Sequence, residues 1–118
     1  MDLEQVKMDL TSEIQLTDIQ ARVFLLLVTK GKMTYQKISE MLKITNDEAL
    51  AAAKDLVGLG GFIEMSETEF ETMHPRFTAV NMYRRMCERN NKEFSKNVTV
   101  DNIGIALEKP YEDARTKK

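Results

Sequence analysis

The chain has 118 residues, of which 31% are charged and 42% hydrophobic, and this length suits one domain with one modest core. The formal net charge of -2 excludes a general basic field. Binding to nucleic acid or to an anionic surface would therefore have to depend on a local group of residues.

The single cysteine, Cys87, excludes an intramolecular disulfide and a cysteine-based zinc site, and it fits a reducing compartment. The N-terminus carries Asp2 and Glu4 and has no apolar signal segment. The longest apolar run, residues 23–28, is far shorter than the roughly 18 residues that cross a bilayer. The sequence thus predicts a cytoplasmic protein with no membrane partner.

Two helices are predicted before residue 31. Residues 1–14 form an amphipathic segment in which Leu3, Val6 and Leu10 recur at helical spacing, and the helix is expected to end in a loop at residues 11–12. A T-x-x-Q capping box then predicts a helix from Asp18 to Lys30. This second helix is apolar around most of its girth, so it must be covered on two sides. The N-terminal helix, a later helix and a second subunit are the candidates.

The following segment predicts a helix-turn-helix. Residues 33–34 form a brief strand, and Thr34 can cap a helix over residues 35–43. The T-x-x-E capping box of Thr45 and Glu48 begins another helix at Asn46, which Gly60 ends. The turn between these helices is short enough to set them at a steep angle.

A two-stranded hairpin, or wing, is expected next. Residues 62–66 alternate between apolar and polar, residues 67–69 can turn, and residues 76–80 can return as the partner strand. The predicted fold is therefore α+β and mostly helical: a winged helix-turn-helix over residues 15–81 with extra N- and C-terminal helices. Four apolar residues are expected to converge in its core: Leu27, Ile38, Leu56 and Ile63.

Residues 82–108 are predicted to form a C-terminal helical extension. Its first helix would be capped by Asn81 and run to Phe94, and its apolar face predicts either a fourth core helix or a homodimer interface. The interface residues would be Met82, Tyr83, Met86 and Phe94. Residues 98–100 look strand-like, a short helix follows them, and Pro110 is expected to stop it. Residues 109–118 are predicted to be a mobile polar tail.

The candidate DNA contacts lie in the helix-turn-helix and the wing. Backbone N–H groups at a helix N-terminus favour a phosphate, and an Asn side chain such as Asn46 can address an adenine edge. The predicted contacts to double-stranded DNA are Thr34, Tyr35, Gln36, Lys37, Thr45, Asn46, Lys54 and Arg76.

Several of these segments resemble one family. Residues 16–25, LTDIQARVFL, are similar to the L-T-x-x-E-A-R-V-Y opening of the DNA-binding domain of TrmB-type archaeal transcriptional regulators. Residues 34–39 and 62–64 match that family's second helix and first wing strand, and residues 76–80 are similar to its R-Y-x-A-V strand. The resemblance covers residues 16–81. It implies a stand-alone DNA-binding regulator without the family's sugar-sensing domain, so no effector can be inferred from it. No cofactor is predicted.

The charges favour a second class of function. The expected recognition helix carries Asp47, Glu48 and Asp55 against the single base Lys54. The wing is also acidic, with Glu64, Glu67, Glu69 and Glu71 opposed only by Arg76. Phosphates would be repelled by such a surface. The alternative to a dimeric transcriptional regulator is therefore a protein-protein interaction module whose acidic wing does not read DNA.

No catalytic or metal site is predicted. His74 has no second His or Cys with which to hold a metal, and no Ser or Cys nucleophile stands at a telling position. The sequence accordingly predicts a protein that is not an enzyme.

Overall fold

The computed structural model describes residues 2–116, and these form a mostly helical α+β fold with one small antiparallel sheet, as predicted. The helices are α1 (Leu3–Ile14), α2 (Asp18–Lys30), α3 (Tyr35–Leu42), α4 (Asn46–Leu59), α5 (Pro75–Arg89) and α6 (Val98–Thr116). The strands are β1 (Met33–Thr34), β2 (Ile63–Glu64) and β3 (Glu69–Glu71), in the spatial order β1-β3-β2.

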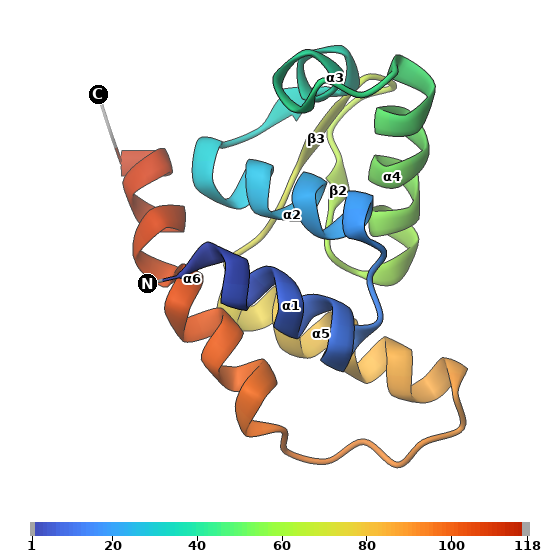
Figure 1. Ribbon diagram of the computed structural model, residues 1–118, viewed down its shortest axis with the longest axis vertical. Coiled ribbons are helices and arrows are strands. Elements are labelled where there is room, and N and C mark those ends of the chain that lie inside the picture. Colours follow the sequence, from blue (N-terminus) through green and yellow to red (C-terminus); the bar gives the residue numbers. More distant parts are fainter. Residues whose placement is uncertain (1, 117–118) are drawn as a thin grey trace.

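Helix α2 lies at the centre of the molecule (Figure 1). It packs against α1 and α6 and also against α3 and α4. Its buried residues include Ala21 and Val28 on one side of the helix axis and Val23 on nearly the opposite side. The chain therefore covers this helix by itself, and the apolar surface that suggested a second subunit is satisfied within one protomer.

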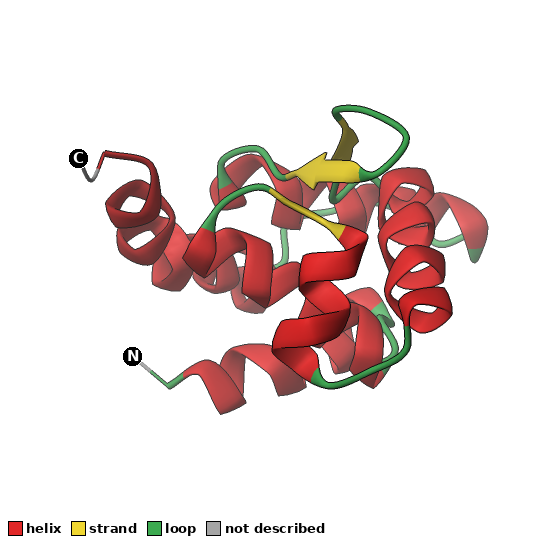
Figure 2. Ribbon diagram, turned by 90° about the horizontal axis from the view of Figure 1, so that it is seen from above, coloured by secondary structure: helices red, strands yellow, loops and turns green. Residues whose placement is uncertain are grey.

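The predicted return strand of the hairpin was wrong. Residues 76–80 begin α5, because His74 caps that helix and Pro75 occupies its first turn, where the missing N–H of proline costs nothing. The partner of β2 is β3 instead, with Ile63 opposite Glu71 and Glu64 opposite Phe70. Figure 2 shows this hairpin projecting from the helical body.

The predicted core was partly wrong at the same place. Leu27, Ile38 and Leu56 are fully buried, whereas Ile63 is 40% exposed. Phe62 and Phe70 are buried instead, and the centroids of their rings lie 6.4 Å apart. The centroid of the Phe24 ring lies 6.3 Å from that of Phe62. Because side chains alternate across a strand, burying Phe62 turns Ile63 toward solvent.

The C-terminal part of the chain differs most from the prediction. Residues 98–100 are the first turn of α6, since the Asn97 side chain accepts a hydrogen bond from the Val100 N–H. The helix continues through Pro110, so residues 109–116 are an ordered helix rather than a mobile tail; residues 117–118 lie outside the described part. The tertiary contacts of Arg115 with α2 and β3 hold this end of α6 in place.

The ends of two further helices differ from the prediction. Helix α1 continues past residues 11–12 to Ile14, and Gln15 ends it in a left-handed conformation with φ 68°. Helix α5 ends at Arg89 rather than at Phe94, and it spans the predicted domain boundary at residues 81–82. One hydrophobic core runs through all the helices, from Val6 in α1 to Leu107 in α6.

Two glycines provide a matched test of this packing. A Cβ added to Gly104 in α6 would lie 2.7 Å from the Arg76 Cα in α5, whereas one added to Gly58 in α4 meets nothing within 4 Å. Gly104→Ala is expected to lower the free energy of unfolding by about 1–3 kcal/mol, as overpacking does. Gly58→Ala is expected to raise it by about 0.5–1 kcal/mol through helix propensity. Urea denaturation of both variants checks the pair, and equal effects of the two substitutions would contradict the close α5–α6 approach.

Candidate functional site

The turn between α3 and α4 is fixed by local hydrogen bonds. The Thr45 hydroxyl accepts from the Glu48 N–H at 3.0 Å, and the Glu48 carboxylate accepts from the Thr45 N–H at 2.9 Å, which completes the predicted capping box. The Ser39 hydroxyl donates to the Ile44 carbonyl at 2.6 Å. Lys43 ends α3 in a left-handed conformation with φ 58° and is exposed. These contacts present the N-terminal end of α4 to solvent.

The structure divides the predicted DNA contacts into two groups. Gln36, Lys37 and Asn46 are exposed, and Lys37 forms an ion pair with Glu40 of the same helix at 3.4 Å. Thr34 and Thr45 use their hydroxyls as helix caps. Tyr35 packs partly against the core, and its N–H donates to the Thr68 carbonyl at 2.9 Å, which joins α3 to the hairpin loop.

The two remaining basic positions are already paired. Lys54 forms an ion pair with Glu64 of β2, so its charge is neutralised by the hairpin. Arg76 stands on α5 rather than in a wing strand, and its guanidinium lies 3.7 Å from Glu108 of α6. Its prediction as a wing contact was therefore wrong, because the segment that carries it is helical.

The predicted dimer interface is mostly internal. Met82 and Met86 are 1% exposed and Tyr83 is 6% exposed, because α5 packs along α6 of the same chain. Phe94 is 45% exposed in the loop after α5, and its ring lies 6.0 Å from that of Tyr83. The three buried side chains are thus not available to a second subunit, so their prediction as interface residues was wrong, whereas that of Phe94 stays a prediction.

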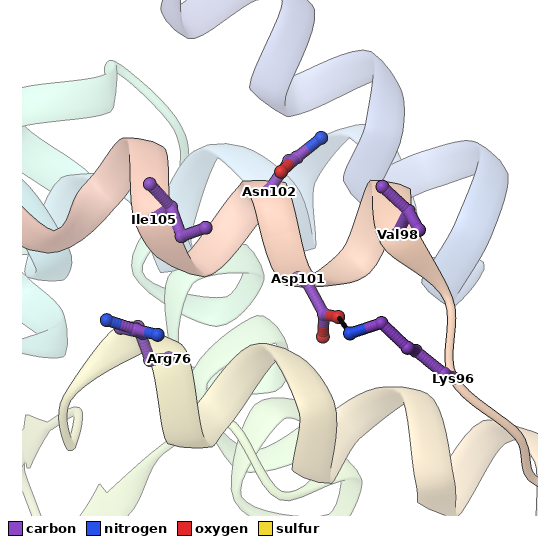
Figure 3. Close-up of a pocket in the computed structure, with 6 residues that line it drawn as sticks. All are labelled: Arg76, Lys96, Val98, Asp101, Asn102 and Ile105. Atoms are coloured by element: carbon purple, nitrogen blue, oxygen red, sulfur yellow. Dashed lines mark hydrogen bonds and ion pairs between the residues drawn. The ribbon is translucent and has the colours of Figure 1, made fainter.

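An open depression lies where α5 meets α6 (Figure 3). Arg76, Val98, Asn102 and Ile105 line it, and Lys96 is held 2.6 Å from Asp101 at its edge. The charged groups pair with one another or with Glu108 instead of converging on a common point. The depression therefore lacks the convergent polar groups of a small-molecule site.

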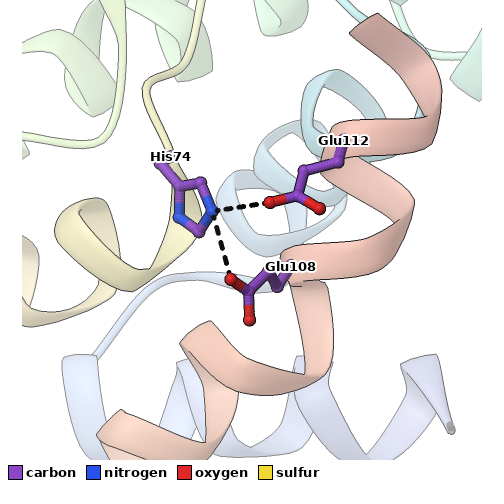
Figure 4. A group of neighbouring side chains, drawn as sticks. All are labelled: His74, Glu108 and Glu112. Atoms are coloured by element: carbon purple, nitrogen blue, oxygen red, sulfur yellow. Dashed lines mark ion pairs between the residues drawn. The ribbon is translucent and has the colours of Figure 1, made fainter. Parts of the chain in front are cut away.

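A second group of polar side chains joins the start of α5 to the C-terminal half of α6 (Figure 4). His74 Nε2 lies 3.7 Å from Glu108 Oε2 and 3.5 Å from Glu112 Oε2. The three ligand atoms lie within 4.8 Å of one another. Sequence reasoning considered only His and Cys as partners for His74, and it placed Glu112 in a mobile tail, so it missed this cluster.

Comparison with known proteins gives no identification: no family model matches the chain, and no curated protein or solved structure matches it significantly. The resemblance to TrmB-type regulators thus stays a prediction made from the residues. Among the described residues, no helix combines the length and the apolar character needed to cross a membrane.

Proposed function

We propose that the chain is a winged helix-turn-helix protein that binds double-stranded DNA as a transcriptional regulator. The observation that supports this best is the exposed N-terminal end of α4, which the turn at residues 43–45 sets beside α3; helix α3 in turn contacts β1 of the three-stranded sheet. In this arrangement α4 is the element that enters the major groove, and its first residues contact base edges.

The contact surface that we propose is smaller than the sequence suggested. Asn46 faces the bases, while Gln36, Lys37 and Lys43 meet phosphates beside the N-terminus of α3 and the turn. Lys54 contributes only if its ion pair with Glu64 opens. The net charge of this part of the molecule disfavours DNA, so affinity should be modest. When a dimer binds, Lys37 and Lys43 of the two copies neutralise roughly four phosphates, so affinity should fall about a hundredfold between about 50 and 200 mM salt.

Substitutions within this surface, compared with one outside it, test the proposal. Lys37→Glu and Asn46→Ala are each expected to weaken binding to duplex DNA in a mobility-shift assay by about tenfold, since one removes a phosphate contact and the other a base contact. Lys92→Glu, in the exposed loop after α5, is the matched control and should change little. Equal losses from Lys37→Glu and Lys92→Glu would show that only the overall charge matters.

A substitution in the hairpin is expected to strengthen DNA binding instead of weakening it. Glu64→Gln removes a negative charge and frees Lys54, so DNA should bind more tightly and with a steeper salt dependence. Weaker binding of this variant would mean that the hairpin itself contacts DNA through Glu64.

The acidic hairpin favours a second candidate, a protein-protein interaction module. Glu64 and Glu67 are exposed, and Ile63 and Met65 beside them are 40% and 50% exposed. Acidic side chains around exposed apolar ones suit a partner with a basic rim and an apolar centre. In that case Glu67→Gln should weaken capture of the partner from a lysate, and the wild-type chain should show no preference among DNA fragments.

A further inference from the structure

We propose that His74, Glu108 and Glu112 form a binding site for one divalent first-row transition ion, with Zn²⁺ as the best-suited probe. One imidazole and two carboxylates are a donor set that such ions accept, and the two negative charges would balance the ion. With three protein ligands, the site would leave a position open for water.

The spacing of the ligand atoms fits an ion better than it fits a hydrogen bond. The Nε2-to-oxygen separations of 3.5 and 3.7 Å are longer than the roughly 2.7–3.2 Å of a good hydrogen bond. In a tetrahedral zinc site with bonds of about 2.0–2.1 Å, neighbouring ligand atoms lie about 3.4 Å apart. A movement of a few tenths of an ångström would bring both Nε2-to-oxygen separations to this value. The two carboxylate oxygens, which lie within 4.8 Å of each other, would approach by at most about 1.4 Å.

The positions of the three side chains also favour binding of one ion. Glu108 and Glu112 stand four residues apart on α6, so both reach the same side of the helix, although like charges at this spacing repel. The Tyr111 ring lies 5.2 Å from the His74 ring and supports it. Arg76 lies 3.7 Å from Glu108 Oε1, which is the oxygen that faces away from His74 Nε2, and so it orients the carboxylate without occupying the site.

Zinc binding must compete with the hydrogen bond by which His74 caps α5. The Arg76 N–H donates to His74 Nδ1 at 3.1 Å, which places the proton of a neutral imidazole on Nε2. Coordination through Nε2 requires that proton to be on Nδ1 instead, so the Arg76 N–H then loses its acceptor. Ion binding would thus break one capping hydrogen bond of α5 and link α6 to the start of α5 through the metal. The loss of that hydrogen bond should change the environment of the Arg76 amide.

Calorimetric titration of the metal-stripped full chain with ZnCl₂ tests the site. One equivalent should bind saturably and raise the melting temperature, whereas Mg²⁺ should do neither because an imidazole suits it poorly. Glu112→Gln and His74→Asn should each weaken zinc binding by about tenfold or more. His74→Asn is informative because Asn can still cap α5, so the fold is kept while the imidazole is lost. Glu93→Gln, in the exposed loop after α5, is the matched control and should bind as the wild type does.

Two results would overturn the site. One is the absence of saturable zinc binding, and the other is binding that His74→Asn and Glu112→Gln leave unchanged, which would place the ion elsewhere. A ¹⁵N–¹H spectrum adds an independent readout, in which zinc should shift the Arg76 amide of the wild type. Zinc binding that left this amide unchanged would contradict coordination by His74 Nε2.

Discussion

Replacing Phe70 with Ala is expected to lower the free energy of unfolding by about 3–5 kcal/mol, the cost of truncating a fully buried Phe. Phe70 is the central residue of β3, is 0% exposed, and packs against the Phe62 ring. It also stands opposite Met33 of β1 and Glu64 of β2, so its loss loosens both strand pairs. Chemical denaturation followed by circular dichroism measures the change.

Ile63→Ala is the matched control for Phe70. The sequence pattern placed Ile63 in the core, whereas the structure leaves it 40% exposed on β2. Its truncation should cost less than about 1 kcal/mol, because little apolar surface is removed from the interior. If Ile63→Ala destabilised the chain more than Phe70→Ala, the register of the hairpin would be wrong.

Arg115→Ala is expected to lower the free energy of unfolding by about 2–4 kcal/mol. The guanidinium donates to the carbonyls of Leu27 and Val28, each at 3.0 Å, near the C-terminal end of α2, where a positive charge is favourable. It also pairs with Glu71 of β3 at 2.6 Å and stacks 3.8 Å above the Tyr111 ring. Removing the guanidinium leaves the half-buried Glu71 carboxylate and the carbonyls of Leu27 and Val28 without this partner.

Lys109→Ala separates this effect from a general loss of charge. Lys109 also lies on α6 and pairs with Asp113 at 3.3 Å, but its side chain is 85% exposed. Such a pair contributes about 0–1 kcal/mol, so the variant should unfold nearly as the wild type does. Similar stabilities for Arg115→Ala and Lys109→Ala would mean that the end of α6 is not anchored.

Local signals in the sequence were sufficient to place the starts of α2 and α4 and the end of α4. The capping boxes at Thr17 and Thr45 each involve residues only three positions apart, and both helices begin where those boxes predict. Glycine after α4 ended it as expected, since Gly60 adopts φ 93°. These boundaries depend on neighbouring residues and not on the rest of the molecule.

The second half depends on contacts between distant residues. Residues 76–80 have strand-forming side chains, but Pro75 and burial against α6 make them helical. Pro110 normally ends a helix, yet Arg115 keeps α6 ordered beyond it through partners in α2 and β3. Pattern and propensity carry no information about these pairings.

The candidate site shows the same division. The sequence located the turn between α3 and α4, and the exposed Asn46 beside it, from local capping. It did not reveal that Glu64 neutralises Lys54, nor that α6 brings Glu108 and Glu112 to His74. Each of these pairs joins separate elements, so its distance depends on the tertiary fold.

Selective retention of genomic DNA fragments tests the proposed function most directly. The wild-type chain, immobilised at about 50 mM salt, should enrich a reproducible subset of a fragment pool, and the enrichment should disappear near 200 mM. A double variant with Lys37→Glu and Asn46→Ala should retain no subset. If the wild type enriched no fragment over this variant at low salt, the chain would not be a DNA-binding regulator.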